Sequence, residues 1–239
     1  MRGCVKIRMT EKEKDFEIYM KLLFFDMEFA DGRVPGSIYS FGYLMTDENF
    51  TVIRPQTDLL IDPDSSWNEY VVENILAYPK EQVEAAPKFP AHYDTLKALF
   101  AEADIAVGFA VNNDTRAIKK DCERYGLEPL AFRTLDMEKL CRRMEEHREA
   151  HGLAGCVEAW CGEIPENQHR SDGDAYATMM LLRAICRAKH ATPEMILTAY
   201  PACCGHSVTP PKARGGRRRK DFRHTKPVKK KEAIPQTEN

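Results

Sequence analysis

The chain has 239 residues, of which 43% are hydrophobic and 30% are charged, enough apolar content for a folded domain with a sizeable core. No apolar run is long enough to span a bilayer, and the first residues lack the apolar core of an export signal, so we expect a cytoplasmic protein with no membrane partner. The eight cysteines include no Cys-x-x-Cys pair, which disfavours a zinc site and predicts reduced, packed thiols.

The formal net charge of −2 is unevenly distributed along the chain. Residues 212–239 carry 11 Lys and Arg against three acidic residues, a formal charge of +8, which leaves −10 for the other 211 residues. We expect this basic segment to be disordered and to serve either as a contact for nucleic acid or another polyanion, or as a localisation signal. The predicted organisation is a lead-in over 1–18, a folded domain over 19–204 and a basic tail over 205–239.

Strand-forming residues and turn signals divide the first quarter of the chain into three strands, over 19–29, 37–44 and 50–55, which predict an antiparallel meander. Helical patterns then alternate with short apolar strands at 105–111 and 132–135. The predicted helices cover 67–77, 91–103, a segment capped by Asn113 or Asp114 and ending at Tyr125, 136–149, 153–160, 171–189 and 193–199. This order predicts an α/β layered fold with a mixed sheet.

Two carboxylates interrupt the apolar residues of the first strand. Side chains alternate along a strand, so Asp26 and Glu28 point to the same face of the sheet. Two like charges close together at the end of a buried strand repel each other, and a divalent cation such as Mg²⁺ or Mn²⁺ relieves that repulsion. The alternative is a strand whose last residues simply reach water.

Three later residues extend this acidic pair. Asp114 follows a buried strand at the start of a helix, and Asp174 lies in the first turns of the long helix with His169 five residues before it. Each has a purely structural explanation: an acidic residue caps a helix or favours its dipole, and a loop histidine commonly faces water. Together with Asp26 and Glu28, they predict a carboxylate cluster with a histidine beside it.

The order of these motifs, Asp26-Met27-Glu28, then residues 107–114, then His169 and Asp174, resembles the DnaQ-like, or DEDDh, 3′–5′ exonuclease family. The resemblance covers about residues 20–190. It implies a ribonuclease-H-like fold, with a mixed sheet formed by the antiparallel meander and parallel strands and flanked by helices.

The resemblance also implies a role for each residue. Asp26, Glu28 and Asp174 would bind one of two Mg²⁺ or Mn²⁺ ions, Asp26 would also touch the second, and Asp114 would act on the second ion through water. His169 would take the proton from the attacking water, which suits the unperturbed pKa of histidine near 6.5. The implied activity is hydrolysis of phosphodiester bonds at the 3′ end of DNA or RNA.

The chain departs from the family pattern where Phe109-Ala110 replaces His-Asn and where Phe29-Ala30 replaces Thr-Gly. We expect Phe29, Ala30 and Phe109 to line the pocket for the terminal nucleotide. Two other interpretations stay open: a silent nuclease-fold protein that binds nucleic acid, and a phosphodiesterase acting on small nucleotides. The tail residues expected to contact nucleic acid are Arg217, Arg218, Arg219, Lys220, Lys229, Lys230 and Lys231.

Overall fold

The computed structural model describes residues 19–34, 36–165 and 169–208. The strands are β1 (Leu22–Phe29), β2 (Ile38–Thr46), β3 (Val52–Leu60), β4 (Ile105–Gly108), β5 (Arg133–Asp136) and β6 (Cys204–His206). The helices are α1 (Glu69–Asn74), α2 (Lys80–Glu84), α3 (Phe89–Glu102), α4 (Asn112–Arg124), α5 (Met137–Arg143), α6 (Gly152–Cys161), α7 (Ser171–Ala188) and α8 (Pro193–Ala199), and a short 3₁₀ helix covers Pro201–Cys203.

The six strands form one mixed sheet in the order β3-β2-β1-β4-β5-β6. The first three strands pair antiparallel, β1, β4 and β5 run parallel, and β6 returns antiparallel to β5. The predicted α/β fold, with a meander joined to parallel strands, is therefore confirmed. None of the described helices is both long and apolar enough to cross a membrane.

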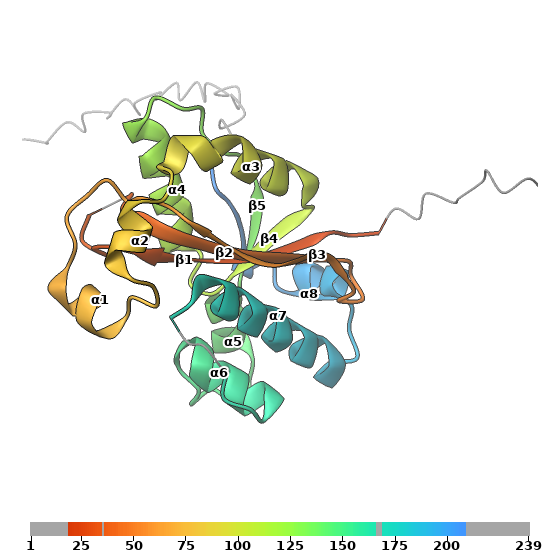
Figure 1. The fold of residues 1–239 in the computed structure, drawn as a ribbon. Helices are drawn as coiled ribbons and strands as arrows, with labels where there is room; N and C mark the ends of the chain where they lie inside the picture. The colour runs from red at the N-terminus through yellow and green to blue at the C-terminus, as the bar shows by residue number, and fades with distance from the viewer. Residues whose placement is uncertain (1–18, 35, 166–168, 209–239) are drawn as a thin grey trace, which may run out of the picture. The chain divides into compact units, whose positions relative to one another are not determined.

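The two faces of β1 contribute to two separate hydrophobic cores. Leu22 and Phe24 are fully buried on the face that also receives side chains of α5, α6, α7 and α8. Leu23 and Phe25 are fully buried on the opposite face, against α3 and α4. Figure 1 shows the two groups of helices on opposite sides of the sheet. Successive side chains of β1 therefore point alternately into the two cores, as the alternation of side chains along a strand predicts.

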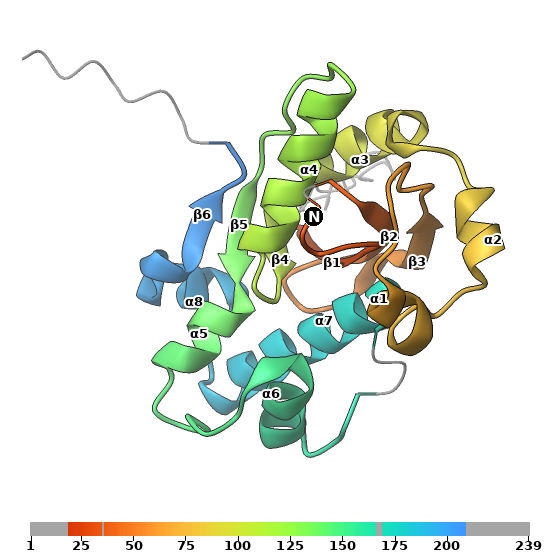
Figure 2. The ribbon, with the colours of Figure 1, turned by 90° about the vertical axis from the view of Figure 1, so that its left-hand side faces the viewer.

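Helix α7 lies directly on β1 and β2, and Figure 2 shows its first turns beneath these strands. Gly42, in the middle of β2, makes this approach possible. A Cβ atom at that position would overlap the main chain of Ser171 and Asp172, at the start of α7. Glycine is required here because of the space its missing side chain leaves for another backbone.

Of the predicted element bounds, two differ most from the structure. The strand predicted at 50–55 continues to Leu60, because β3 is an edge strand and the missing N–H of Pro55 is tolerated there. The helix predicted at 136–149 ends six residues early, where Met144 adopts an extended backbone and buries its side chain in the core. Burial of this side chain outweighs the helical pattern of the polar residues that follow.

The folded domain extends beyond its predicted end at residue 204. Strand β6 pairs with β5, and the Ser207 N–H donates to the Phe132 carbonyl at 3.0 Å. This pairing supplies hydrogen-bond partners to the backbone groups along one edge of β5. It depends on a contact between distant segments, so no local sequence pattern predicts it. The rest of the predicted tail, 209–239, and the lead-in over 1–18 lie outside the described residues.

Replacing Gly42 with alanine should move α7 away from the sheet, because the added methyl group meets backbone atoms, which cannot rotate aside as a side chain can. Overpacking of this kind costs about 1–3 kcal/mol or more in unfolding free energy. Urea unfolding of Gly42→Ala measures the decrease.

Gly155→Ala is the matched control, since nothing lies within 4 Å of a Cβ at that position in α6. It should leave stability unchanged or raise it by up to about 1 kcal/mol, because alanine favours helix. Equal stability of the two variants would show that the approach of α7 does not depend on Gly42.

Candidate metal centre

Asp26 and Glu28 lie near the carboxyl end of β1, on the face of the sheet that α7 covers. They continue the row begun by Leu22 and Phe24, which are buried beneath α7. In open α/β sheets, ligand sites commonly form at the carboxyl ends of the strands. The sheet therefore presents two carboxylates where its apolar core ends.

Asp174 completes a group of three carboxylates. It lies in the first turn of α7, and one carboxylate oxygen from each of Asp26, Glu28 and Asp174 lies within 4.8 Å of the other two. Three converging carboxylates are a typical oxygen-donor set for Mg²⁺ or Mn²⁺. The structure thus brings together residues that are almost 150 positions apart in the sequence.

Burial raises the pKa of every carboxyl group in this cluster, and neighbouring carboxylates raise it further. For Asp26 the pKa lies well above its usual range, first because of burial and then because of Asp114, Glu28 and Asp174. The pKa of Glu28 is raised to about 8 by burial and then by Asp174 and Asp114. Burial also raises the pKa of Asp174. A bound cation would favour the charged forms and relieve the repulsion.

Asp114 lies in the first turn of α4 and is buried. It is outside the group of three close carboxylates, yet its charge raises the pKa of Asp26. Its own pKa is raised to about 8, by burial and then by Asp136. The prediction that Asn113 or Asp114 caps this helix was wrong, because α4 begins at Asn112 without a side-chain cap. The Asp114 carboxylate is therefore not used in capping its own helix.

His169 lies in the loop before α7 and is exposed. Its backbone N–H donates to the Asp174 Oδ2 atom at 3.2 Å, which ties the histidine to the cluster. The charge of its imidazole also lowers the pKa of Asp174, opposing the effect of burial. Its φ of 66° places it in the left-handed region, which is uncommon for a residue other than glycine. The backbone of His169 is thus tied to Asp174, while the residue remains accessible to water.

The three residues predicted to line a nucleotide pocket differ in accessibility. Phe29 is half-buried and lines a hollow of about 290 Å³ together with Arg33 and Arg116. Phe109 is half-buried and packs against the core beneath α7. Ala30 has no exposed surface and packs in a small core with Tyr39, so it is not available to a substrate, contrary to the prediction.

Two acidic residues near the cluster had no role in the sequence prediction. Asp58, on β3, raises the pKa of Asp26 and Glu28, and Asp136, at the end of β5, raises that of Asp114. Asp58 was missed because the third strand was predicted to end before it. Asp136 had a detectable signal, since it directly follows the predicted strand at 132–135.

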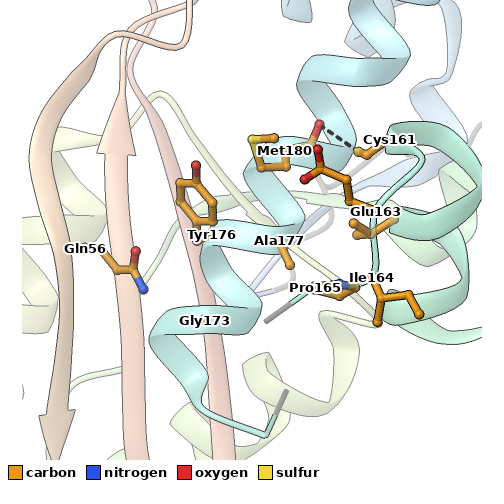
Figure 3. Close-up of a pocket in the computed structure, with 10 residues that line it drawn as sticks. Gln56, Cys161, Glu163, Ile164, Pro165, Gly173, Tyr176, Ala177 and Met180 are labelled. Atoms are coloured by element: carbon orange, nitrogen blue, oxygen red, sulfur yellow. Dashed lines mark hydrogen bonds between the residues drawn. The ribbon is translucent and has the colours of Figure 1, made fainter. Parts of the chain in front are cut away.

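A hollow of about 340 Å³ lies beside α7. Figure 3 shows its lining residues between β3 and the segment after α6. Gln56, Gly173, Tyr176 and Ile164 are among its lining residues, and none of the four predicted carboxylate ligands lines it. The chemistry that the sequence predicts is therefore centred on the end of β1, outside this hollow.

Comparison with known proteins agrees with this geometry. The RNase_T family model, described as exonuclease, matches residues 23–182, which is more than half of the chain. No curated protein matches the chain. The matched segment contains Asp26, Glu28, Asp114, His169 and Asp174.

Solved nuclease structures share the fold at low sequence identity. The nuclease domain of 3′hExo, a DEDDh family member bound to rAMP, is 12% identical with a TM-score of 0.59, and the match covers 72% of this chain and 94% of that one. E. coli exonuclease I in complex with a dA16 oligonucleotide is 16% identical with a TM-score of 0.64, and the match covers 77% of this chain and 43% of that one. Cell-death related nuclease 4 is 14% identical with a TM-score of 0.59, and the match covers 71% of this chain and 64% of that one.

The metal-free protein should lose stability as the pH rises from about 4 towards 8. Glu28 and Asp114 have pKa values near 8 in the folded protein, whereas unfolded carboxyl groups titrate near 4. Between these values the unfolded chain releases protons first, so the stability contributed by these two groups is highest at low pH and falls as the pH rises. Thermal unfolding at about pH 5 and pH 8 measures the change.

Mg²⁺ should raise the melting temperature more at the higher pH, because it binds the charged carboxylates. Asp26→Asn supplies the comparison: removing one charge should flatten the pH dependence and weaken the response to Mg²⁺. A Mg²⁺ response that is the same at both pH values would argue against a metal site at this cluster.

Proposed function

Because the chain belongs to the DnaQ-like (DEDDh) exonuclease family, we propose that it removes nucleotides from the 3′ end of DNA or RNA by metal-dependent hydrolysis. The observation that carries this proposal is the convergence of Asp26, Glu28 and Asp174 within 4.8 Å at the end of β1. The buried Asp114 and the exposed His169 beside them supply the remaining groups that the reaction needs.

The donor set fits divalent cations. All four groups are carboxylates, the ligands that Mg²⁺ and Mn²⁺ prefer. Their pKa values are raised first by burial and then by neighbouring carboxylates, and a bound cation would favour the charged forms. Asp26, Glu28 and Asp174 would hold one ion, and Asp26 and Asp114 would hold a second, with water between Asp114 and the ion. Bound ions lower the pKa of water and stabilise the charge on the phosphoryl oxygens and the leaving 3′ oxygen.

His169 is proposed as the general base. His169 is exposed, and its backbone N–H donates to the Asp174 carboxylate, which keeps the residue next to the cluster. Its imidazole would take a proton from a water molecule near the cluster. The imidazole then returns that proton to solvent.

The preference for a 3′ end rests on family membership and on two similar structures, which contain rAMP and a dA16 oligonucleotide. It is tested with single-stranded DNA and RNA carrying a 5′ label, with Mg²⁺ or Mn²⁺. The expected product is a ladder that shortens from the 3′ end. Early release of a labelled mononucleotide would contradict the direction, and cleavage of mononucleotide esters alone would favour a small-nucleotide phosphodiesterase.

Substitutions within the cluster should separate metal binding from proton transfer. Asp26→Asn and Asp174→Asn should abolish turnover, because each removes a carboxylate ligand. His169→Ala should retain Mn²⁺ binding but lower kcat by about 10²–10⁴-fold, the usual contribution of a positioned base. Mn²⁺ binding by electron paramagnetic resonance and single-turnover cleavage measure the two effects.

Asp94→Asn serves as the control, since Asp94 is an exposed residue of α3, on the opposite face of the sheet. It should leave both measurements unchanged. Full turnover by either cluster variant would contradict the assignment of its carboxylate.

The basic tail is proposed to hold long substrates. Positive charge concentrated in residues 212–239 offsets the −10 of the other 211 residues, which would repel a phosphate chain. Within the folded domain, Lys119 and Lys120 form ion pairs with Glu123. The negative charge of Glu123 weakens the attraction of these lysines for the phosphates of a substrate. Contacts between tail and phosphates would release counterions and make binding dependent on salt.

Deleting residues 212–239 should weaken binding to long nucleic acids and reduce the slope of log K against log salt by about 0.7 for each phosphate that the tail neutralises. Cleavage of short substrates should change little, because the cluster is intact. In a control variant, each Lys and Arg of residues 212–239 is replaced by Gln. This variant keeps the length of the tail and removes its positive charge, so it distinguishes the effect of charge from the effect of length. Equal salt slopes with and without the tail would refute the proposal.

A further inference from the structure

One carboxylate connects three hydroxyl groups at the start of α7. Asp58, on β3, accepts hydrogen bonds at Oδ1 from the Ser40 hydroxyl at 2.6 Å and the Ser171 hydroxyl at 2.9 Å. Its Oδ2 accepts from the Tyr78 hydroxyl at 2.5 Å. Ser40 and Ser171 are buried, and their hydroxyls also contact each other. A buried hydroxyl needs a partner, and Asp58 supplies one to both serines.

The three hydroxyls come from parts of the chain that are far apart in sequence. Ser40 is on β2, Tyr78 lies in the segment between α1 and α2, and Ser171 is the first residue of α7. Asp58 is also the register partner of Gly42, the position where α7 comes closest to the sheet. The carboxylate therefore lies where the sheet, the helix and the α1–α2 segment meet.

Tyr78 extends this connection to the loop that carries His169. The guanidinium of Arg170 lies 5.5 Å from the centre of the Tyr78 ring, a cation–π arrangement, and Arg170 also pairs with Asp172 at 3.2 Å. The Arg170 carbonyl accepts the N–H of Asp174 at 2.9 Å. Asp58 therefore contacts the start of α7 in two ways: directly through the Ser171 hydroxyl, and indirectly through Tyr78, whose ring packs against Arg170.

We infer that Asp58 is a positioning residue for the metal centre: through Ser171 and Tyr78, it fixes the first turn of α7 and so places the Asp174 carboxylate against Asp26 and Glu28. This inference rests on the proposed function, because it assigns Asp174 to metal binding. Asp58 itself is outside the group of three close carboxylates, so its role is to orient a ligand. Removal of groups that orient metal ligands commonly weakens metal affinity about 10–100-fold.

Two substitutions of Asp58 distinguish positioning from a simple effect of charge. Asn keeps an oxygen that can accept from Ser40 and Ser171, and its amide can donate to the Tyr78 hydroxyl, whereas Ala removes all three hydrogen bonds. If Asp58 acts by hydrogen bonding, Asp58→Ala should weaken Mn²⁺ binding about tenfold or more and Asp58→Asn much less. If it acts through its charge, both should change binding equally, and that result would overturn the inference.

Ser171→Ala tests the connection to α7 without changing any carboxylate. It should weaken Mn²⁺ binding and lower kcat, with little change in KM for nucleic acid, and it carries the test if Asp58→Ala does not fold. Thr57→Ala is the matched control on the same strand, because the Thr57 hydroxyl bonds only the nearby Pro55 carbonyl among the described residues. A lower melting temperature with unchanged Mn²⁺ affinity and kcat would show that Asp58 supports only folding.

Mn²⁺ binding is measured by electron paramagnetic resonance well below each melting temperature, so this readout requires neither substrate nor turnover. Absence of Mn²⁺ binding in the unmodified protein would overturn the proposed function itself. Binding in the unmodified protein together with equal binding in Asp58→Ala and Ser171→Ala would overturn only the positioning role.

Discussion

The arrangement of the whole site depends on how closely α7 approaches β2. Gly42 leaves room for the main chain of Ser171 and Asp172, and this contact brings Asp174 over the end of β1. Farther along α7, Leu181 and Ile185 are buried in the core beneath the sheet and hold the rest of the helix. A small residue on a strand thus decides the position of a carboxylate on a helix more than a hundred residues later.

That close packing has an electrostatic cost. Asp26, Glu28, Asp114 and Asp174 are concentrated where burial raises the pKa of each, and the causes that raise them further are other carboxylates. Such an arrangement opposes folding at neutral pH unless cations or protons compensate. The apolar cores on both faces of the sheet must therefore stabilise a local arrangement that favours metal binding over stability.

The prediction of fold was strongest where local pattern and packing agree. Alternation along the first strand correctly assigned Asp26 and Glu28 to one face, and helical spacing located α7 to within a residue at either end. It failed where long-range contacts decide the outcome: β6 exists because β5 offers it an edge, and α5 ends where Met144 turns into the core. The buried position of Ala30, directly after β1, likewise depends on packing with Tyr39 of β2.

The sequence by itself determined the order of the acidic motifs, the alternation that pairs Asp26 with Glu28, and the family resemblance, because these are properties of residue type and spacing. The resemblance implied that Asp174 joins this pair, but only the tertiary structure decided how closely the three carboxylates approach, that Ala30 is buried, and that Asp58 links three segments. The physical reason is that distances between elements are set by packing, here by the space at Gly42 and the buried hydroxyls around Asp58, and neither is encoded by local spacing.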